Sequence, residues 1–425
     1  MSDTAIHDER LLAADGTPLK QKLARTTRRM RLNALLLTLP LVLFLLVSFV
    51  LPIGQMLFRS VHNPTGTNVA PNFAVAIQDW DANEGIPGEE LIALFVKDLA
   101  AAANNREVGK TVGNLATRMN YEVPGSRSLF TKTARKVKRW KEGPYREELL
   151  KLDKRWNNPI IWRTLQRVSK DYTLSFYLAA TDNKYNEKGE IVQADELYQI
   201  YNKTLWKTLY LSALITVLCF LIAYPVAYLL STLPLRASNL LMILVLLPFW
   251  TSLLVRTSAW IAMLQKEGII NNILVYLGFI SDQHRIQMIY NATGTVVSMV
   301  HILLPFMILP LYSVMKTIPP SYMRAARSMG ASGTYAFFRV YFPQTIPGIA
   351  AGTLLVFILA IGYYITPALV GGQDGIFISN EIARHIQKSL NWSLGAALGT
   401  ILLFVVLVLY WLYNKLVGVD KLKFG

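Results

Sequence analysis

The chain has 425 residues, of which 53% are apolar and 16% are charged. Soluble globular proteins carry about 25% charged residues, so this composition points to a membrane protein. Its 43 Lys and Arg outnumber its 27 Asp and Glu, which leaves a net charge of +16. The single cysteine, Cys219, excludes an intrachain disulfide framework and a cysteine-based zinc site. The sequence therefore predicts no metal site, and it gives no support to metallohydrolase chemistry.

Six apolar segments are long enough to cross a bilayer. The first, residues 35–58, carries no charge, and as a helix it would extend about 36 Å. We interpret it as a retained anchor and not as a cleaved export signal. The other five segments are 208–233, 240–264, 288–315, 344–370 and 393–414. Between them they hold one formal charge, Arg256, which fits either an interface anchor or a transport path.

The basic residues near these segments predict the orientation of the chain. Segment 1–34 is strongly basic, and placing it in the cytoplasm also places most other short-loop Lys and Arg there. Both termini are then cytoplasmic, in a bacterial inner (plasma) membrane. The basic N-terminal run would also contact anionic lipid headgroups, and we do not expect it to bind nucleic acid.

Between the first two spans lies a polar insert, residues 59–204, with 22 basic and 18 acidic residues. On this topology it is a periplasmic domain. Helical spacing of apolar residues in 88–104 and 146–170 predicts a mainly helical fold. The tripeptide Gly109-Lys110-Thr111 resembles the end of a phosphate-binding loop, but Asn104 occupies the position of the required glycine and a helix precedes it. We therefore predict that this chain does not bind ATP there.

The remainder, 205–425, forms a five-helix core with a basic cytoplasmic loop at 316–343. In this loop Pro319-Pro320 ends the preceding helix, and Ser321 is predicted to cap a new one. Gly330 ends that helix, and Ser332 caps a second short helix that runs to Phe342. Two short helices joined at a glycine form a compact projection.

This loop resembles the EAA loop of ATP-binding-cassette importer permeases. The resemblance rests on Ala325-Ala326, Gly330 and Val340-Tyr341-Phe342-Pro343, at matching spacing. Arg324 departs from the family, which usually has Glu there, and Val340 and Phe342 replace the usual Ile and Leu. The resemblance implies that the loop docks on a separate ATPase dimer, which holds ATP and Mg, so that this chain has no cofactor. The residues it assigns to ATPase coupling are Ser321, Arg324, Ala325, Ala326, Met329, Gly330, Ser332 and Pro343.

Three further segments, 247–257, 304–312 and 362–372, resemble the spermidine/putrescine branch of these permeases. The resemblance covers the six spans and not the unusually long insert. It implies an all-α membrane protein with six transmembrane helices of the type I importer permease kind, plus the helical insert. It also implies a periplasmic solute-binding protein, a second permease subunit and a polyamine or related cationic amine as solute. By analogy with other large outer loops, the insert would dock the binding protein.

Aromatic residues and carboxylates mark a candidate translocation path. Aromatic faces attract ammonium groups by about 0.5 to 2 kcal/mol without a fixed counter-charge. Acidic residues at the outer mouth would attract a polycation. The candidates are Trp250, Arg256, Tyr363, Tyr364, Asp374 and Glu381. For the aromatic residues, interface anchoring or helix packing is an equally open interpretation.

Three alternatives remain open at this stage. Opines or other amino-acid-derived solutes use similar permeases. An ion-coupled secondary transporter would need an intramembrane carboxylate, and the six spans contain no Asp or Glu, with His301 their only histidine. We expect His301 to be a neutral ring hydrogen-bonded to a neighbouring helix. A membrane receptor or scaffold would not need the docking loop. We therefore expect a non-enzymatic transport subunit.

Overall fold

The computed structural model describes residues 19–417, apart from 106, 108–109, 141 and 187. The N-terminal part of segment 1–34 and the last eight residues of 205–425 thus lie outside the described residues. The chain divides into two units, residues 1–58 and residues 59–425.

The described part of the first unit is one long helix with a basic beginning and an apolar remainder. Helix α1 (Leu19–Leu45) passes through a π turn, η1 (Leu46–Val50), into α2 (Leu51–Val61). Residues Arg25–Val61 together are long and apolar enough to cross a membrane, and they contain the predicted span 35–58. Only Leu51 separates the π turn from Pro52, whose missing N–H removes one helical hydrogen bond.

The insert is mainly helical, as predicted. Its helices are α3 (Thr65–Val69), α4 (Pro71–Ala76), η2 (Ile77–Asp79), η3 (Ala82–Glu84), α5 (Glu89–Ala102), α6 (Val112–Glu122), α7 (Ser126–Val137), α8 (Tyr145–Leu152), η4 (Lys154–Asn157), α9 (Pro159–Val168) and α10 (Ser175–Ala180). Helix α5 confirms the prediction for 88–104. Segment 146–170 is also helical, in three pieces, because the Asp153 and Asn158 side chains each accept a backbone N–H and so begin new helices, η4 and α9.

An aromatic cluster forms the core of the insert. Phe95 lies at its centre, fully buried, with ring centroids 5.0 Å from Phe73 and 5.5 Å from Trp156. Trp156 donates its indole N–H to Thr133 Oγ1 at 3.1 Å, and Trp162 donates to the Trp156 carbonyl at 3.0 Å. These hydrogen bonds satisfy the indole N–H groups of the buried tryptophan rings. The buried rings give the insert a hydrophobic core of its own.

A two-stranded hairpin leads from the insert to the membrane helices. Strands β1 (Asn183–Tyr185) and β2 (Ile191–Gln193) pair antiparallel, and η5 (Glu196–Tyr198) follows. Asp182, just before β1, is buried, and its carboxylate accepts the backbone N–H groups of residues 200, 201 and 202 at 2.8 to 3.0 Å. This carboxylate therefore caps the next helix from 18 to 20 residues away, which the sequence analysis did not predict.

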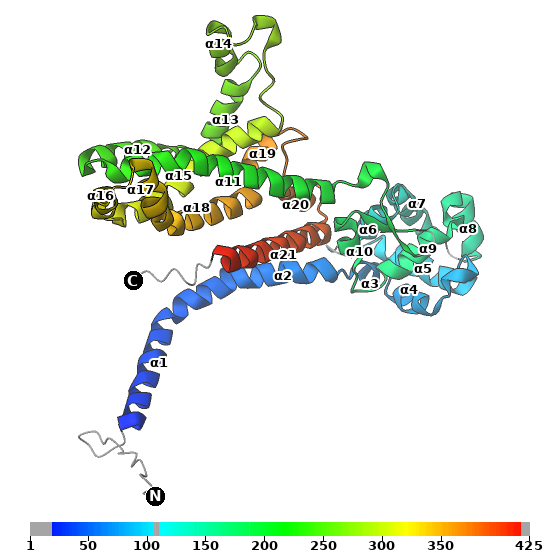
Figure 1. Cartoon of the computed structure of the whole chain (residues 1–425). Helices are drawn as coiled ribbons and strands as arrows, with labels where there is room; N and C mark the ends of the chain where they lie inside the picture. Colours follow the sequence, from blue (N-terminus) through cyan, green and yellow to red (C-terminus); the bar gives the residue numbers. More distant parts are fainter. Residues whose placement is uncertain (1–18, 106, 108–109, 141, 187, 418–425) are drawn as a thin grey trace, which may run out of the picture. The chain divides into compact units, whose positions relative to one another are not determined.

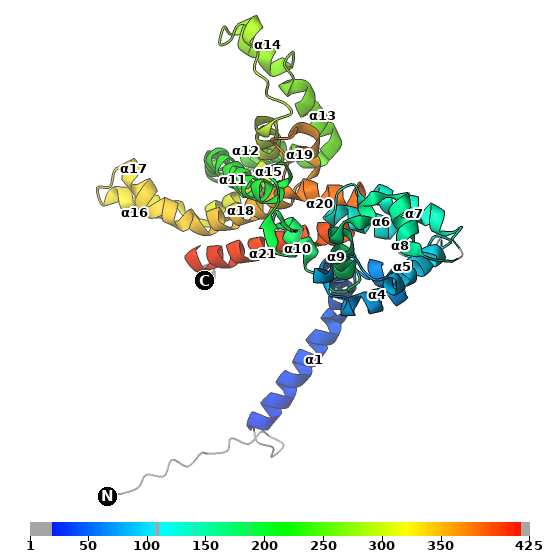
Figure 2. The same cartoon turned by 90° about the vertical axis from the view of Figure 1, so that its right-hand side faces the viewer.

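Three helices form the centre of the permease core: α11 (Tyr201–Thr232), α15 (Ala292–Thr317) and α18 (Phe342–Gly362). Small residues allow their close approach: a Cβ at Gly352 would lie 2.7 Å from the sulfur of Met307. Helix α21 (Trp392–Val417) packs against α18, α10 and the preceding α20 (Ile378–Gln387). The insert and the helices of the 316–343 loop lie at opposite ends of this bundle (Figures 1 and 2).

Two predicted spans are interrupted. Segment 240–264 consists of α12 (Leu235–Trp250) and α13 (Leu253–Leu264), and the chain bends by 95° between them. Helix α14 (Ile269–Tyr276) and η6 (Asp282–His284) follow. Segment 344–370 divides into α18 and α19 (Ile365–Val370). The described residues thus contain five helices that could cross a membrane, or six if the bent pair counts as one span.

Candidate functional site

The 316–343 loop contains two short helices, α16 (Pro320–Ser328) and α17 (Gly333–Ala336). Helix α15 ends at Thr317, before Pro319-Pro320, as predicted. The prediction that Ser321 caps α16 is wrong: the helix begins at Pro320, so Ser321 lies inside its first turn. Proline favours the first helical position because its φ angle is already helical and its N–H is not needed there.

The turn between these helices has the predicted form. Gly330 has a φ of +89°, a conformation that favours glycine, and Met329 N–H bonds the Ala325 carbonyl at 3.1 Å. Ser332 then caps α17, since its hydroxyl accepts the Tyr335 N–H at 3.3 Å. Arg324, Ala325 and Met329 are exposed, whereas Ala326 packs inward.

The second short helix does not end at Phe342 as predicted. Helix α17 continues through a π turn, η7 (Phe337–Tyr341), directly into α18, so that residues Gly333–Gly362 form one helical stretch. The Phe342 N–H bonds the Phe337 carbonyl, five residues back. Pro343 follows immediately, and the wider π turn accommodates its ring and its missing N–H. The loop is therefore joined to a membrane helix without a break.

An aromatic cluster fixes the loop on the end of α11. The Tyr228 ring lies 5.7 Å from Phe337 and 5.3 Å from Tyr341, edge to face in both cases. Lys316 donates to the Ser231 carbonyl at 3.3 Å. Arg324 and Arg327 line a cavity of about 710 Å³ next to this cluster. A force applied to α16 would thus reach α11 and α18 through packed side chains.

The candidate path residues lie near the two breaks in the spans. Trp250 ends α12 and is 74% exposed, and Arg256 on α13 is half-buried. Among the described residues the Arg256 Nε has no hydrogen-bond partner. One turn further on, Trp260 donates its indole N–H to His301 Nδ1 at 3.1 Å. His301 is therefore bonded to a neighbouring helix, as expected.

The break after α18 exposes two backbone carbonyls that α20 satisfies. The Ser379 hydroxyl donates to the Tyr363 carbonyl at 2.7 Å, and the Asn380 amide donates to the Tyr364 carbonyl at 2.7 Å. Irregular backbone in a membrane protein requires such partners. Sequence reasoning missed Ser379 and Asn380, although a Ser-Asn pair after a glycine-rich turn is typical of capping.

The two candidate carboxylates of the outer mouth differ in environment. Asp374 is exposed in the turn after α19. Glu381 is only 5% exposed and forms an ion pair with Arg384 on the same helix. Lys207 donates to the Gln373 carbonyl at 3.2 Å and lies close enough to both carboxylates to interact with their charge. The structure thus leaves Asp374 as the more accessible of the two.

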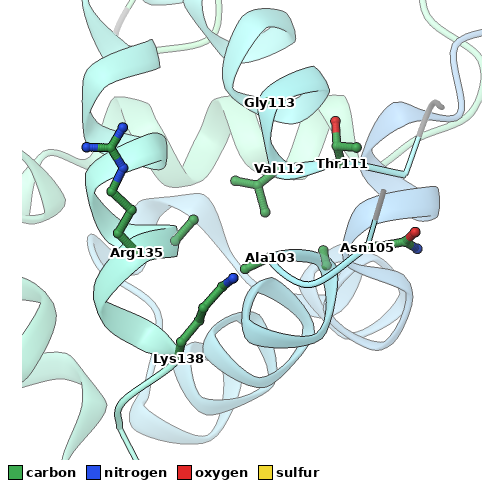
Figure 3. A pocket seen from close by; sticks show the side chains of 9 residues that line it. Ala103, Asn105, Thr111, Val112, Gly113, Arg135 and Lys138 are labelled. Carbon is green, nitrogen blue, oxygen red and sulfur yellow. The ribbon is translucent and has the colours of Figure 1, made fainter. Parts of the chain in front are cut away.

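Thr111, the last residue of the tripeptide that resembles a phosphate-binding loop, lines a small cavity of about 320 Å³ (Figure 3). Gly109 lies outside the described residues. Thr111 caps α6, while Arg135 of α7 and Lys138, just after the end of α7, form the opposite wall. The preceding element is the helix α5, where a phosphate-binding loop has a strand. The surroundings therefore differ from those of such a loop.

The described geometry defines a multi-pass membrane protein with broken spans at one end and a projection of two short helices, α16 and α17, at the other. Residues 219–417 match the family of binding-protein-dependent transport system inner membrane components. The chain belongs to this family, the permeases of ATP-binding-cassette importers.

Curated relatives agree with this assignment. The chain is 37% identical over 221 residues to the spermidine/putrescine transport system permease protein PotB of Haemophilus influenzae, covering 51% of this chain and 77% of that protein. It is 35% identical to PotB of Escherichia coli, covering 47% of this chain and 71% of that protein. The sequence-based assignment to this branch is thereby confirmed. The solved structure of a bacterial ABC transporter involved in alginate import is similar, with a TM-score of 0.44 and 19% sequence identity. The alignment covers 53% of this chain and 80% of that chain.

Proposed function

We propose that this chain imports a polyamine or related cationic amine, together with a second permease subunit, an ATPase dimer and a periplasmic solute-binding protein. The identity to the PotB permeases carries this proposal. The absence of Asp and Glu from the six predicted spans argues against an ion-coupled carrier. In a bacterial inner membrane both termini and the 316–343 loop would be cytoplasmic, and the insert would be periplasmic.

In this proposal the ATPase moves α16. The exposed Arg324, Ala325 and Met329 form the docking surface, and Gly330 and Ser332 hold the two short helices at a fixed angle. Because α17 continues into α18, a displacement of the projection would move that span as a rigid element. The ATPase supplies the ATP and Mg, and no residue of this chain takes part in hydrolysis.

The solute would pass between this chain and the second permease subunit, near the breaks in the spans. Trp250, Tyr363 and Tyr364 offer aromatic faces that attract an ammonium group. A fixed carboxylate there would hold a polycation too tightly for release, so weak aromatic contacts suit a path. The exposed Asp374 would raise the local concentration of the cation at the mouth.

A second solute class has one observation in its favour. Arg256 is the only formal charge in the predicted spans, and its Nε has no hydrogen-bond partner among the described residues. A guanidinium pairs well with a carboxylate. An opine or another amino-acid-derived solute with a carboxylate would satisfy it, whereas a pure polyamine would not.

The charge reversal Arg324→Glu tests the coupling role. Arg324 replaces the usual acidic residue, so we expect it to face an acidic site on its ATPase, and the reversal should weaken assembly at least fivefold. Co-purification of the ATPase and stimulation of its activity in proteoliposomes are the measurements. Arg339→Glu is the matched control, because Arg339 is also exposed but does not line the loop cavity. Equal behaviour of the two variants would contradict the docking role of Arg324.

A further inference from the structure

A second cavity lies where the insert meets the permease core. Its volume is about 850 Å³. One wall comes from the insert, mainly α6 and the start of α7. The other comes from residues 388–393, which join α20 to the first turn of α21. The two walls are tied together at the rim: Tyr121 donates to the Ser389 carbonyl at 2.9 Å, and the Asn63 amide donates to Ser393 Oγ at 3.0 Å. We call this the junction cavity.

The junction cavity is cationic. Arg118, Arg127 and Lys388 line it, and no Asp or Glu is among its described lining residues. The charge of Arg118 is matched by Glu122 at 2.7 Å. Arg127 and Lys388 are exposed and form no ion pair with another described residue. Two cations therefore remain available to an occupant, and a cationic solute would be repelled.

The cavity also offers unused hydrogen-bond donors. Asn391 is only 5% exposed, its Oδ1 accepts the Leu394 N–H at 3.2 Å, and its Nδ2 has no partner among the described residues. A buried amide donor without an acceptor is costly, so it marks a place where an acceptor is expected. Among the described residues, the Asn120 side chain bonds only through its oxygen, which accepts two backbone N–H groups. Free donors and positive charge together favour an occupant that carries carboxylates.

The walls carry polar groups that a peptide segment can bond. Nine of the fifteen lining residues have a side-chain amide or hydroxyl group, and these groups match the donors and acceptors of a peptide backbone. The cavity lies at the end of the bundle opposite α16 and α17, where the proposed function places the binding protein (Figures 1 and 2).

We propose that the junction cavity receives a carboxylate-bearing surface segment of the solute-binding protein. The proposal rests on the proposed function and adds the site and the chemistry of docking. An occupant held by Arg127 on the insert and by Lys388 and Asn391 on the core contacts both walls at once. It thereby fixes the docked protein against the α20 helix, whose Ser379 and Asn380 hold the break after α18.

The test uses proteoliposomes that hold the whole transporter, with uptake measured against the concentration of the system's own binding protein. In Arg127→Glu/Lys388→Glu we expect the half-saturating concentration to rise at least tenfold at 50 mM salt, with an unchanged maximal rate and a smaller effect at 500 mM. Lys136→Glu/Arg146→Glu is the matched control, because these exposed cations lie on α7 and α8 outside the cavity. The control variant should change the half-saturating concentration less than twofold.

Three outcomes would overturn the proposal. An unchanged half-saturating concentration in the cavity variant, or an equal rise in the control, removes the docking role. A fall in maximal rate alone assigns the residues to gating. Stabilisation of the purified transporter by free glutamate at millimolar concentration, lost in the cavity variant, assigns the cavity to small carboxylates. Failure of the proposed function is distinguishable, because the unmodified transporter would then show no uptake that depends on the binding protein.

Discussion

At the scale of single residues, Asp182 is the strongest test of how the insert is joined to the membrane helices. Its buried carboxylate accepts three backbone N–H groups at the start of α11. In Asp182→Ala these donors lose their partner in a site with little water. We therefore expect the free energy of unfolding to fall by about 2 kcal/mol or more. The melting temperature of the purified chain in lipid nanodiscs measures it. Asp195→Ala is the control, because Asp195 forms only an exposed ion pair with Lys184. A control that melts as low as Asp182→Ala would disprove the capping role.

His385 makes stability depend on pH. Burial, with a smaller contribution from the charge of Arg384, lowers the pKa of His385 to about 4 from its ordinary value of 6.5. The neutral ring bonds the Tyr201 hydroxyl at 2.8 Å and the Ser389 hydroxyl at 3.0 Å. Because the unfolded chain binds a proton more readily, the full stability is present above pH 6.5 and is lost as the pH falls towards 4.

On acidification from pH 7 to pH 4.5, protonation of His385 should therefore lower the free energy of unfolding by about 2 kcal/mol. Thermal melting of the chain at both pH values checks the expectation against His385→Gln. Glutamine keeps a hydrogen-bonding side chain but does not titrate, so the variant should lose less stability on acidification. The same pH slope in both proteins would show that other groups control the response.

At the scale of elements, the turn after α19 depends on glycine. Gly372 has a φ of +55°, and a Cβ there would lie 2.2 Å from the Tyr290 carbonyl oxygen. Gly372→Ala should therefore destabilise the turn by about 3 kcal/mol or more, because backbone strain and a clash add together. Gly189→Ala is the control for backbone strain alone, because Gly189 has a φ of +85° and open space around it. This substitution should lower the free energy of unfolding by about 1 kcal/mol. Thermal melting of both variants decides whether the clash contributes.

The same scale shows what the sequence could predict. Hydropathy located the five helices that could cross a membrane and the bent pair α12–α13, and helical spacing located α5, because both signals depend on composition close in the chain. Hydropathy did not predict the breaks at residues 251–252 and 363–364, because the segments on both sides of each break are apolar. The carbonyl groups of Tyr363 and Tyr364 find their donors 16 residues away on Ser379 and Asn380. The β1–β2 hairpin and the Asp182 cap likewise depend on contacts that no short window of sequence contains.

For the candidate site, motif spacing predicted the Gly330 turn and the Ser332 cap but misplaced the start of α16 and the end of α17. Both errors involve a proline. Pro320 begins a helix where Ser321 was expected to cap it, and proline is favoured at that first helical position. Pro343 was expected to stop a helix, but the π turn before it carries the helix through.

At the scale of the whole molecule, the remaining question is which end of the bundle faces the cytoplasm, and the chain offers a clean test. Its only cysteine, Cys219, is fully buried, so introduced cysteines can be labelled without background. Met329 on the 316–343 loop is 83% exposed, and Leu197 in the insert is 82% exposed. If the excess of basic residues sets the orientation, Leu197→Cys should react with a membrane-impermeant maleimide in intact spheroplasts. Met329→Cys should react only after permeabilisation. Labelling in the reverse order would place the projection outside, where no ATPase could reach it.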